Sequence, residues 1–64
     1  MDLKILAQNL RRLRAAKGIS QKDLAESAGI SLPAIKNLEG CKVEPRMNTL
    51  QSIAAALDVR LQEL

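Results

Sequence analysis

The chain has 64 residues, and its ten Lys and Arg outweigh seven Asp and Glu to give a formal net charge of +3. It contains no His and a single cysteine, Cys41, so an internal disulfide, a zinc site built from Cys and His, and a catalytic histidine are excluded. We therefore expect neither an enzyme nor a bound cofactor.

The composition favours helices. Phe, Tyr and Trp are absent, while small aliphatic side chains are abundant, which suits closely packed helices. A chain of this length has room for one domain and buries only roughly 60% of the surface that its unfolded form exposes. We predict a single all-α domain over residues 1–64, folded as a compact bundle of about five short helices.

The sequence also predicts where the protein resides. No apolar run reaches the length of about 18 residues that a membrane-spanning helix needs. A signal peptide is not apparent, and one cysteine gives no sign of an oxidising compartment. These features predict a cytoplasmic protein without a membrane partner.

The first helix is predicted from Asp2 to Lys17. Asp2 can cap its N-terminus, and Gly18 can supply the left-handed residue that ends it. Arg11 and Arg12 fall on the solvated side. The apolar side chains recur at three- and four-residue steps, as a buried helix face requires: Leu3, Leu6, Leu10 and Leu13.

Two short helices are predicted to follow. Ser20 and Asp23 can form a capping box at the start of the second helix. Ser31 can cap the third, with Pro33 in the first turn, where a missing amide has no helical partner to lose. Because helices of about eight residues do not persist alone in water, the pair must be held by packing against the helices on either side.

Residues 40–47 carry dense turn signals and are expected to form a loop. A fourth helix should open at Met47 or Asn48, and a fifth helical turn is suggested near the C-terminal end by Val59, Leu61 and Leu64. The apolar positions of the fourth helix have helical spacing: Leu50, Ile53, Ala54 and Leu57.

The third helix should bury Ile35 and Leu38 and expose its opposite face. An exposed helix face led by its N-terminal turn is what a reader of the major groove requires. The residues predicted on that face are Leu32, Pro33, Lys36 and Asn37.

The helix pair at residues 21–39 resembles that of the lambda-repressor-like, Xre/Cro-type helix-turn-helix family. The likeness extends from Leu6 to about Leu64. It implies sequence-specific binding of double-stranded DNA by a bacterial or phage transcriptional regulator, as a homodimer on a two-fold symmetric operator. The matching residues are Gln21, Leu24, Ala25, Gly29, Ile30, Ser31, Ile35, Leu38 and Glu39.

Four residues are candidates for contacting base edges. Asn37 can form two hydrogen bonds with an adenine, and Lys36 can reach a guanine or a phosphate. Leu32 and Pro33 stand where family members often carry polar readers. They can offer only apolar contact, for instance to a thymine methyl group, or they form a small docking patch for another protein.

Four further residues are candidates for contacting the DNA backbone or minor groove. The resemblance assigns Gln21, in the first turn of the second helix, to a phosphate. Ser31 can contact a phosphate or base besides capping its helix. Lys42 and Arg46 lie in the following loop, and Arg46 resembles a family arginine that enters the minor groove. The alternative for each is a solvated side chain.

Arg14 and Glu39 are expected to have a structural role. The resemblance implies that an arginine of the first helix pairs with the glutamate at the end of the third, and Arg14 and Glu39 match these positions. The alternative is a surface pair of Glu39 with Lys36 or Lys42, which would stabilise the fold little.

Cys41 occupies a position where the family commonly has glycine. Either Gly40 takes the left-handed conformation that ends the third helix, or Cys41 itself adopts a positive φ at some cost. Both alternatives are compatible with the sequence.

Two other functions compete with DNA reading. An antitoxin-type or adaptor module would use the same fold with a protein, such as a toxin or regulator, as its main partner, and Leu32 and Pro33 would belong to its docking surface. An isolated helical domain without a present function is the third hypothesis. We expect a dimer surface, where one exists, near residues 57–64.

Overall fold

The computed structural model describes residues 2–64. Within them the chain forms four α-helices and a final 3-10 turn, which confirms the all-α prediction. The fifth predicted helix is therefore a single tight turn. The elements are α1 (Leu3–Lys17), α2 (Gln21–Ala28), α3 (Leu32–Glu39), α4 (Met47–Leu57) and η1 (Leu61–Glu63).

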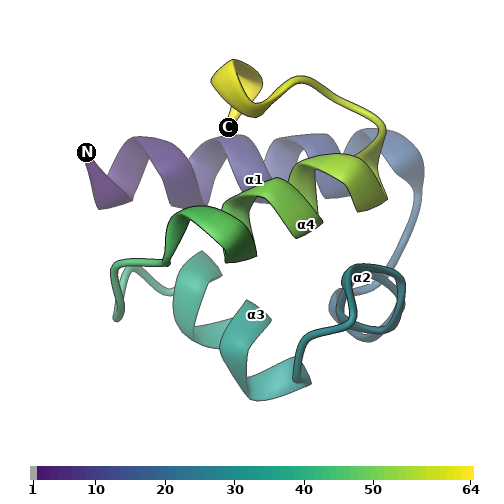
Figure 1. Ribbon diagram of the computed structural model, residues 1–64, viewed down its shortest axis with the longest axis horizontal. Coiled ribbons are helices and arrows are strands. Elements are labelled where there is room, and N and C mark those ends of the chain that lie inside the picture. The colour runs from purple at the N-terminus through teal and green to yellow at the C-terminus, as the bar shows by residue number, and fades with distance from the viewer. Residues whose placement is uncertain (1) are drawn as a thin grey trace.

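The helices form two levels (Figure 1). α1 and α4 lie side by side, while α2 and α3 cross beneath them. α2 packs against both α3 and α4, and α3 packs against α1. The chain after α4 turns back so that η1 and the C-terminus lie over the upper level. No helix among the described residues is long and apolar enough to cross a membrane.

The first helix boundaries follow local rules that the sequence already contains. Asp2 caps α1, its Oδ1 accepting the backbone amide of Lys4 at 2.9 Å. Gly18 ends α1 and Gly29 ends α2, with φ of 69° and 70°. These left-handed values favour glycine, because a Cβ atom would crowd the backbone there.

Serine caps open the two helices of the lower level. Ser20 Oγ accepts the amide of Asp23 at 3.0 Å, and the Asp23 carboxylate accepts the amide of Ser20 at 3.1 Å, which completes the predicted capping box. Ser31 Oγ accepts the amide of Ala34 at 3.2 Å at the start of α3. The capping box thus fixes the start of α2 after the α1–α2 turn, and the Ser31 cap fixes the start of α3 after Gly29.

One aliphatic core holds the helices together. Every helix of the four contributes to it, so the two eight-residue helices are stabilised by packing, as their length requires. Leu32, Ile30, Val59 and Leu64 pack against the core while remaining partly exposed. The buried cluster consists of Leu10, Leu13, Leu24, Ala25, Ile35, Leu38, Ile53 and Leu57.

The end of α3 resolves the alternative at Gly40 and Cys41. Gly40 has a φ of −92°, whereas Cys41 adopts a φ of 59°. This left-handed residue allows the Lys42 amide to reach back to the Asn37 carbonyl at 2.9 Å. A cysteine therefore occupies a conformation that glycine adopts with less strain.

Candidate nucleic-acid interface

Two of the four predicted base-edge residues lie on the outermost side of α3. Ile35 and Leu38 are buried, with 0% and 4% of their surfaces exposed. Pro33 and Asn37 lie four residues apart on the opposite side and are both exposed. Lys36 is also exposed and lies at the flank of this surface. The α3 face that the sequence predicts is therefore present for these three residues.

Leu32 departs from the prediction. Its side chain is half-buried and packs against the core, so it does not share the exposed face. The reason is its register: Leu32 lies three residues before Ile35 and seven before Glu39, which places it at the edge of the buried stripe. The apolar surface available beside Asn37 is supplied by Pro33 and by half-buried Ala34 instead.

An open depression of about 380 Å³ adjoins this face of α3. It runs between α3 and the segment that leads into α4. The structure thereby brings Asn37 and Arg46 to one site, although they are nine positions apart in the chain. The lining residues are Ala34, Asn37, Leu38, Val43, Glu44, Pro45, Arg46 and Thr49.

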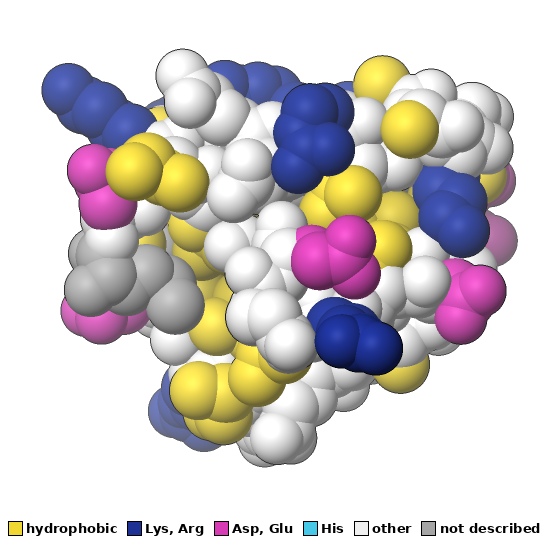
Figure 2. Space-filling view, turned by 90° about the horizontal axis from the view of Figure 1, so that it is seen from above, with side chains coloured by type: hydrophobic (Ala, Val, Ile, Leu, Met, Phe, Trp, Pro, Cys, Tyr) yellow, Lys and Arg dark blue, Asp and Glu magenta, His cyan; other side chains and the backbone are white. Residues whose placement is uncertain are grey.

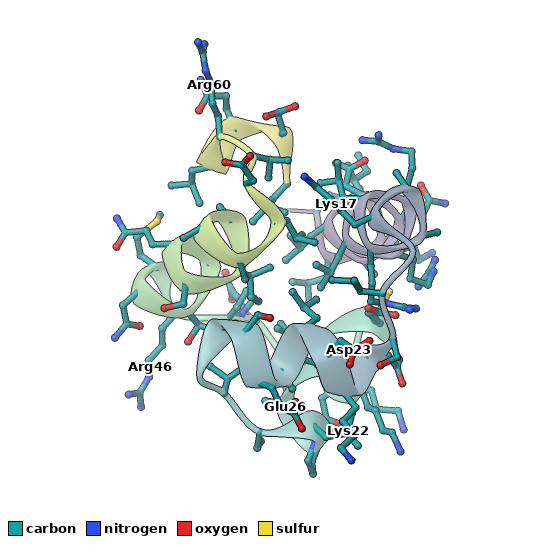
Figure 3. All side chains as sticks on the ribbon, turned by 90° about the vertical axis from the view of Figure 1, so that its right-hand side faces the viewer. Lys17, Lys22, Asp23, Glu26, Arg46 and Arg60 are labelled. Carbon is teal, nitrogen blue, oxygen red and sulfur yellow. The ribbon has the colours of Figure 1, made fainter. Side chains whose placement is uncertain are left out.

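The N-terminus of α4 opens beside this depression. Arg46 is the N-cap residue and forms no side-chain cap, and the first turn contains no acidic residue. The first backbone amides of α4 therefore keep free donors, and the positive end of the helix dipole favours an anion there. Figure 3 shows the Arg46 side chain pointing away from the body of the protein.

Gln21 takes part in an internal contact that sequence reasoning did not foresee. Its Nε2 donates to Glu39 Oε1 at 3.2 Å, and the residue is half-buried. One of the two amide hydrogens is thereby committed to α3, and the second remains available to a ligand. The predicted phosphate contact stays a prediction, now restricted to that second hydrogen.

Arg14 and Glu39 form the predicted ion pair. Arg14 Nε donates to Glu39 Oε2 at 2.8 Å, and Nη2 donates to Oε1 at 3.1 Å. Nη1 donates to the carbonyl of Ile19 at 3.0 Å, so one guanidinium joins α1, the α1–α2 turn and α3. The hydrogen bonds that the Glu39 carboxylate accepts raise the pKa of Arg14 above its ordinary value. Glu39 keeps only 6% of its surface exposed, so its charge depends on these donors.

Arg11 is a structural residue that sequence reasoning missed. We placed it on the solvated side of the first helix, but its Nη1 donates to the backbone carbonyl of Glu39. The carbonyls of residues 36–38 accept backbone amides from residues 40–42, so Arg11 supplies a partner for the next carbonyl at the end of α3. Its position one turn before Arg14, facing the same neighbour, is the signal that was available.

Ser31 and Lys42 lie outside the depression. Ser31 Oγ is engaged as the cap of α3, although its hydroxyl hydrogen can still be donated. Lys42 is exposed in the loop after α3. Neither side chain lines the depression with Asn37 and Arg46, so both remain candidates for the rim of an interface.

The face that carries η1 offers a different surface. In the part of it that the structure describes, Lys and Arg side chains stand apart, with acidic and apolar groups between them (Figure 2). Lys17 and Arg60 project on this upper half of the molecule, away from Arg46 (Figure 3). The described part of this face therefore lacks the continuous basic surface that contact with a phosphate backbone favours.

The comparison with protein families agrees with this geometry. The family described as Helix-turn-helix matches residues 10–64. The chain belongs to this helix-turn-helix family. The match spans α2 and α3 together with α4, η1 and the second half of α1, so it extends beyond the helix pair that gives the family its name.

Similar helix-turn-helix proteins are transcriptional regulators by name. DdrOP3, an HTH-type transcriptional regulator of Deinococcus deserti, is 37% identical over 59 residues, which cover 92% of this chain and 46% of that protein. The uncharacterized HTH-type transcriptional regulator y4dJ of Sinorhizobium fredii is 35% identical over 65 residues, which cover 100% and 84%. This chain therefore spans less than half the length of DdrOP3.

A solved structure has nearly the same fold. The restriction-modification controller protein C.AhdI from Aeromonas hydrophila superposes with a TM-score of 0.94 at 34% identity, covering 97% of this chain and 94% of that one. The family that the sequence predicts and the helix-turn-helix fold are confirmed.

Proposed function

We propose that residues 1–64 form a sequence-specific domain that binds double-stranded DNA within a transcriptional regulator, with α3 in the major groove. One observation carries the proposal: Asn37 of α3, Arg46 and the uncapped start of α4 border the same open depression. A base reader and two groups suited to phosphate or minor-groove contact thus meet at one face. The chain belongs to the helix-turn-helix family, and the relatives it resembles are named as transcriptional regulators, which supports this function.

Base reading rests on Asn37. Its side-chain NH2 group can donate to N7 of an adenine while its oxygen accepts from the N6 amino group. The other bases do not match this bidentate arrangement. Lys36 stands at the flank of the same face and reaches either a guanine or a phosphate. Because a protein helix fits the major groove with its N-terminal residues toward the bases, the first two turns of α3 carry the sequence information.

Contacts to the DNA backbone set the position of α3. The free amides at the start of α4 can bind one phosphate, and the guanidinium of Arg46 reaches another or enters the minor groove. Lys42, the free hydrogen of the Gln21 amide and the Ser31 hydroxyl add contacts at the rim. Contacts of these groups with the DNA backbone do not depend on the base sequence. They therefore contribute affinity, and Asn37 contributes discrimination between sequences.

The regulator acts by occupying an operator and so excluding or recruiting polymerase. One domain offers few base contacts, so we propose a homodimer on half-sites about 34 Å apart. The partly exposed apolar residues of the C-terminal segment, within residues 57–64, are the proposed dimer surface. A protein whose partner is bacterial or phage DNA resides in the cytoplasm.

The test is a selection of bound duplexes from a random-sequence pool at about 0.15 M salt. It is run on the wild type and on an Asn37→Ala, Lys36→Ala double variant, with Arg12→Ala as the matched control on the exposed side of α1. An enriched two-fold symmetric motif that weakens only in the double variant supports the proposal. Binding without enrichment contradicts sequence reading.

A protein partner is the second candidate function. Val43 and Met47 expose 42% and 56% of their surfaces, and Val43 lines the depression beside Asn37. A toxin or regulator that buries these side chains would compete with DNA for the same face. Binding of such a partner that is unaffected by saturating operator DNA would contradict a shared surface.

A further inference from the structure

The exposed side of α3 carries little hydrogen-bonding capacity. Successive residues of a helix are about 100° apart around its axis, so Asn37 falls between Pro33 and Ala34 when α3 is viewed from its end. Pro33 is exposed, and Ala34 is half-buried at the edge of the depression. A single amide is therefore flanked by two apolar groups on the surface that would face the bases.

Apolar groups in the major groove are selective. A proline ring or an alanine methyl group that displaces water from a base oxygen or nitrogen gives that atom no new hydrogen bond, which is costly. The C5-methyl group of thymine is the one methyl group that the four standard bases present in this groove. Contact with it buries apolar surface on both partners and leaves no polar atom unsatisfied.

We propose that Pro33 and Ala34 are specificity-determining residues that contact thymine methyl groups beside the base pair read by Asn37. The inference rests on the proposed function and deepens it. Pro33 and Asn37 are four residues apart, which is about 6 Å along the axis, and base pairs are spaced by about 3.4 Å. The contacted thymine therefore lies within about two base pairs of the adenine, and each half-site contains an A·T-rich segment.

The burial of Leu32 is what makes this assignment specific. Because Leu32 packs against the core, the larger apolar side chain at the start of α3 contributes to stability, and the smaller groups remain for DNA. Lys36 lies on the far side of Pro33 from Ala34, so the polar side chains do not cover the apolar pair. A half-site read by α3 then combines one hydrogen-bonded base with adjoining methyl contacts.

The test removes single methyl groups from the DNA. In the operator obtained from the selection, each thymine is replaced in turn by deoxyuridine, which lacks only the C5-methyl group, and affinity for the wild-type protein is measured. We expect a three- to fivefold loss at one or two positions within two base pairs of the adenine, about the effect of burying one methyl group. Replacing such a T·A pair by C·G should also weaken binding. Replacing that cytosine by 5-methylcytosine restores the methyl group and should recover part of the affinity.

Two variants assign the contact to the protein side. The deoxyuridine effect should disappear in Pro33→Ser or in Ala34→Gly, while replacements elsewhere in the operator keep their effects. Thermal midpoints of both variants show whether the fold is retained, and the wild-type measurement stands without them. An operator in which no thymine methyl group matters overturns this inference and leaves the proposed function intact. A pool without any enriched motif overturns both.

Discussion

The guanidinium of Arg14 and the carboxylate of Glu39 meet through two hydrogen bonds, of 2.8 and 3.1 Å, between the end of α1 and the end of α3. The same carboxylate accepts a hydrogen bond from Gln21 at the start of α2. One buried acid thus connects three helices. Because α3 carries Asn37, this connection bears on the stability of the fold and on the position of the proposed DNA-reading face.

Arg14→Met should destabilise the protein by about 3 kcal/mol, mainly because Glu39 would be left buried without its charged partner. Arg12→Met removes a charge from the exposed side of α1 and serves as the control. The raised pKa of Arg14 means that the stability linked to its own proton is fully present below the ordinary arginine pKa and is lost as the pH rises through the raised value. Equal thermal midpoints for the two variants would contradict this assignment.

Arg11→Met should cost about 1 kcal/mol, the usual size of one hydrogen bond, because the Glu39 carbonyl would lose its side-chain donor. The loss should be smaller than for Arg14 and larger than for Arg12. Both Arg11 and Arg14 contact Glu39, so the double variant should show a loss that differs from the sum of the two. Chemical unfolding of the four proteins measures this, and an additive double variant would indicate independent contacts.

The lowered pKa of Asp23 predicts that the stability of the fold decreases at low pH. Hydrogen bonds from the backbone amide and then the hydroxyl of Ser20 lower the pKa of this carboxyl group. A lowered pKa in the folded state stabilises the protein above the unfolded value, and the contribution is lost as the pH falls through the folded value. Thermal midpoints measured from pH 6 down to about pH 2 should therefore decline less steeply for Asp23→Asn than for the wild type. Parallel curves would contradict the capping role.

Features set by neighbouring residues could be predicted from the sequence. The caps at Asp2, Ser20 and Ser31 and the glycine ends of α1 and α2 depend on backbone groups within a few residues, so the residue types suffice. The family resemblance added the Arg14–Glu39 pair, which joins residues 25 positions apart.

Features set by packing could not be predicted from the sequence. Leu32 was expected on the exposed face because only Ile35 and Leu38 were assigned to the core, and the width of the buried stripe depends on how α1 and α2 approach α3. The contacts of Arg11 and Gln21 with Glu39 require the same knowledge. The absence of a side-chain cap at the start of α4 could have been predicted, because Arg46 stands at the cap position. That this helix start lies beside Asn37 is a property of the fold.

Cys41→Gly should stabilise the protein by about 1 kcal/mol. Cys41 has a φ of 59°, and a residue with a Cβ atom is strained in this left-handed region. Its thiol forms only a weak contact, 3.6 Å from the carbonyl of Leu3. Cys41→Ala is the matched control, because it removes the thiol and keeps the strain. A gain of equal size in both variants would assign the effect to the thiol and contradict strain at this residue.

Arg46 and Glu44 carry opposite charges at the same depression and should change DNA binding in opposite directions. Arg46→Met should weaken binding to all duplexes about equally and reduce the slope of log affinity against log salt by about 0.9, the value for one phosphate contact. Glu44→Gln should strengthen binding to all duplexes, because a negative charge near the DNA backbone is removed. Affinities at several salt concentrations, for the operator and an unrelated duplex, measure both effects. A loss in Arg46→Met confined to the operator, with an unchanged salt slope, would instead identify Arg46 as a base reader.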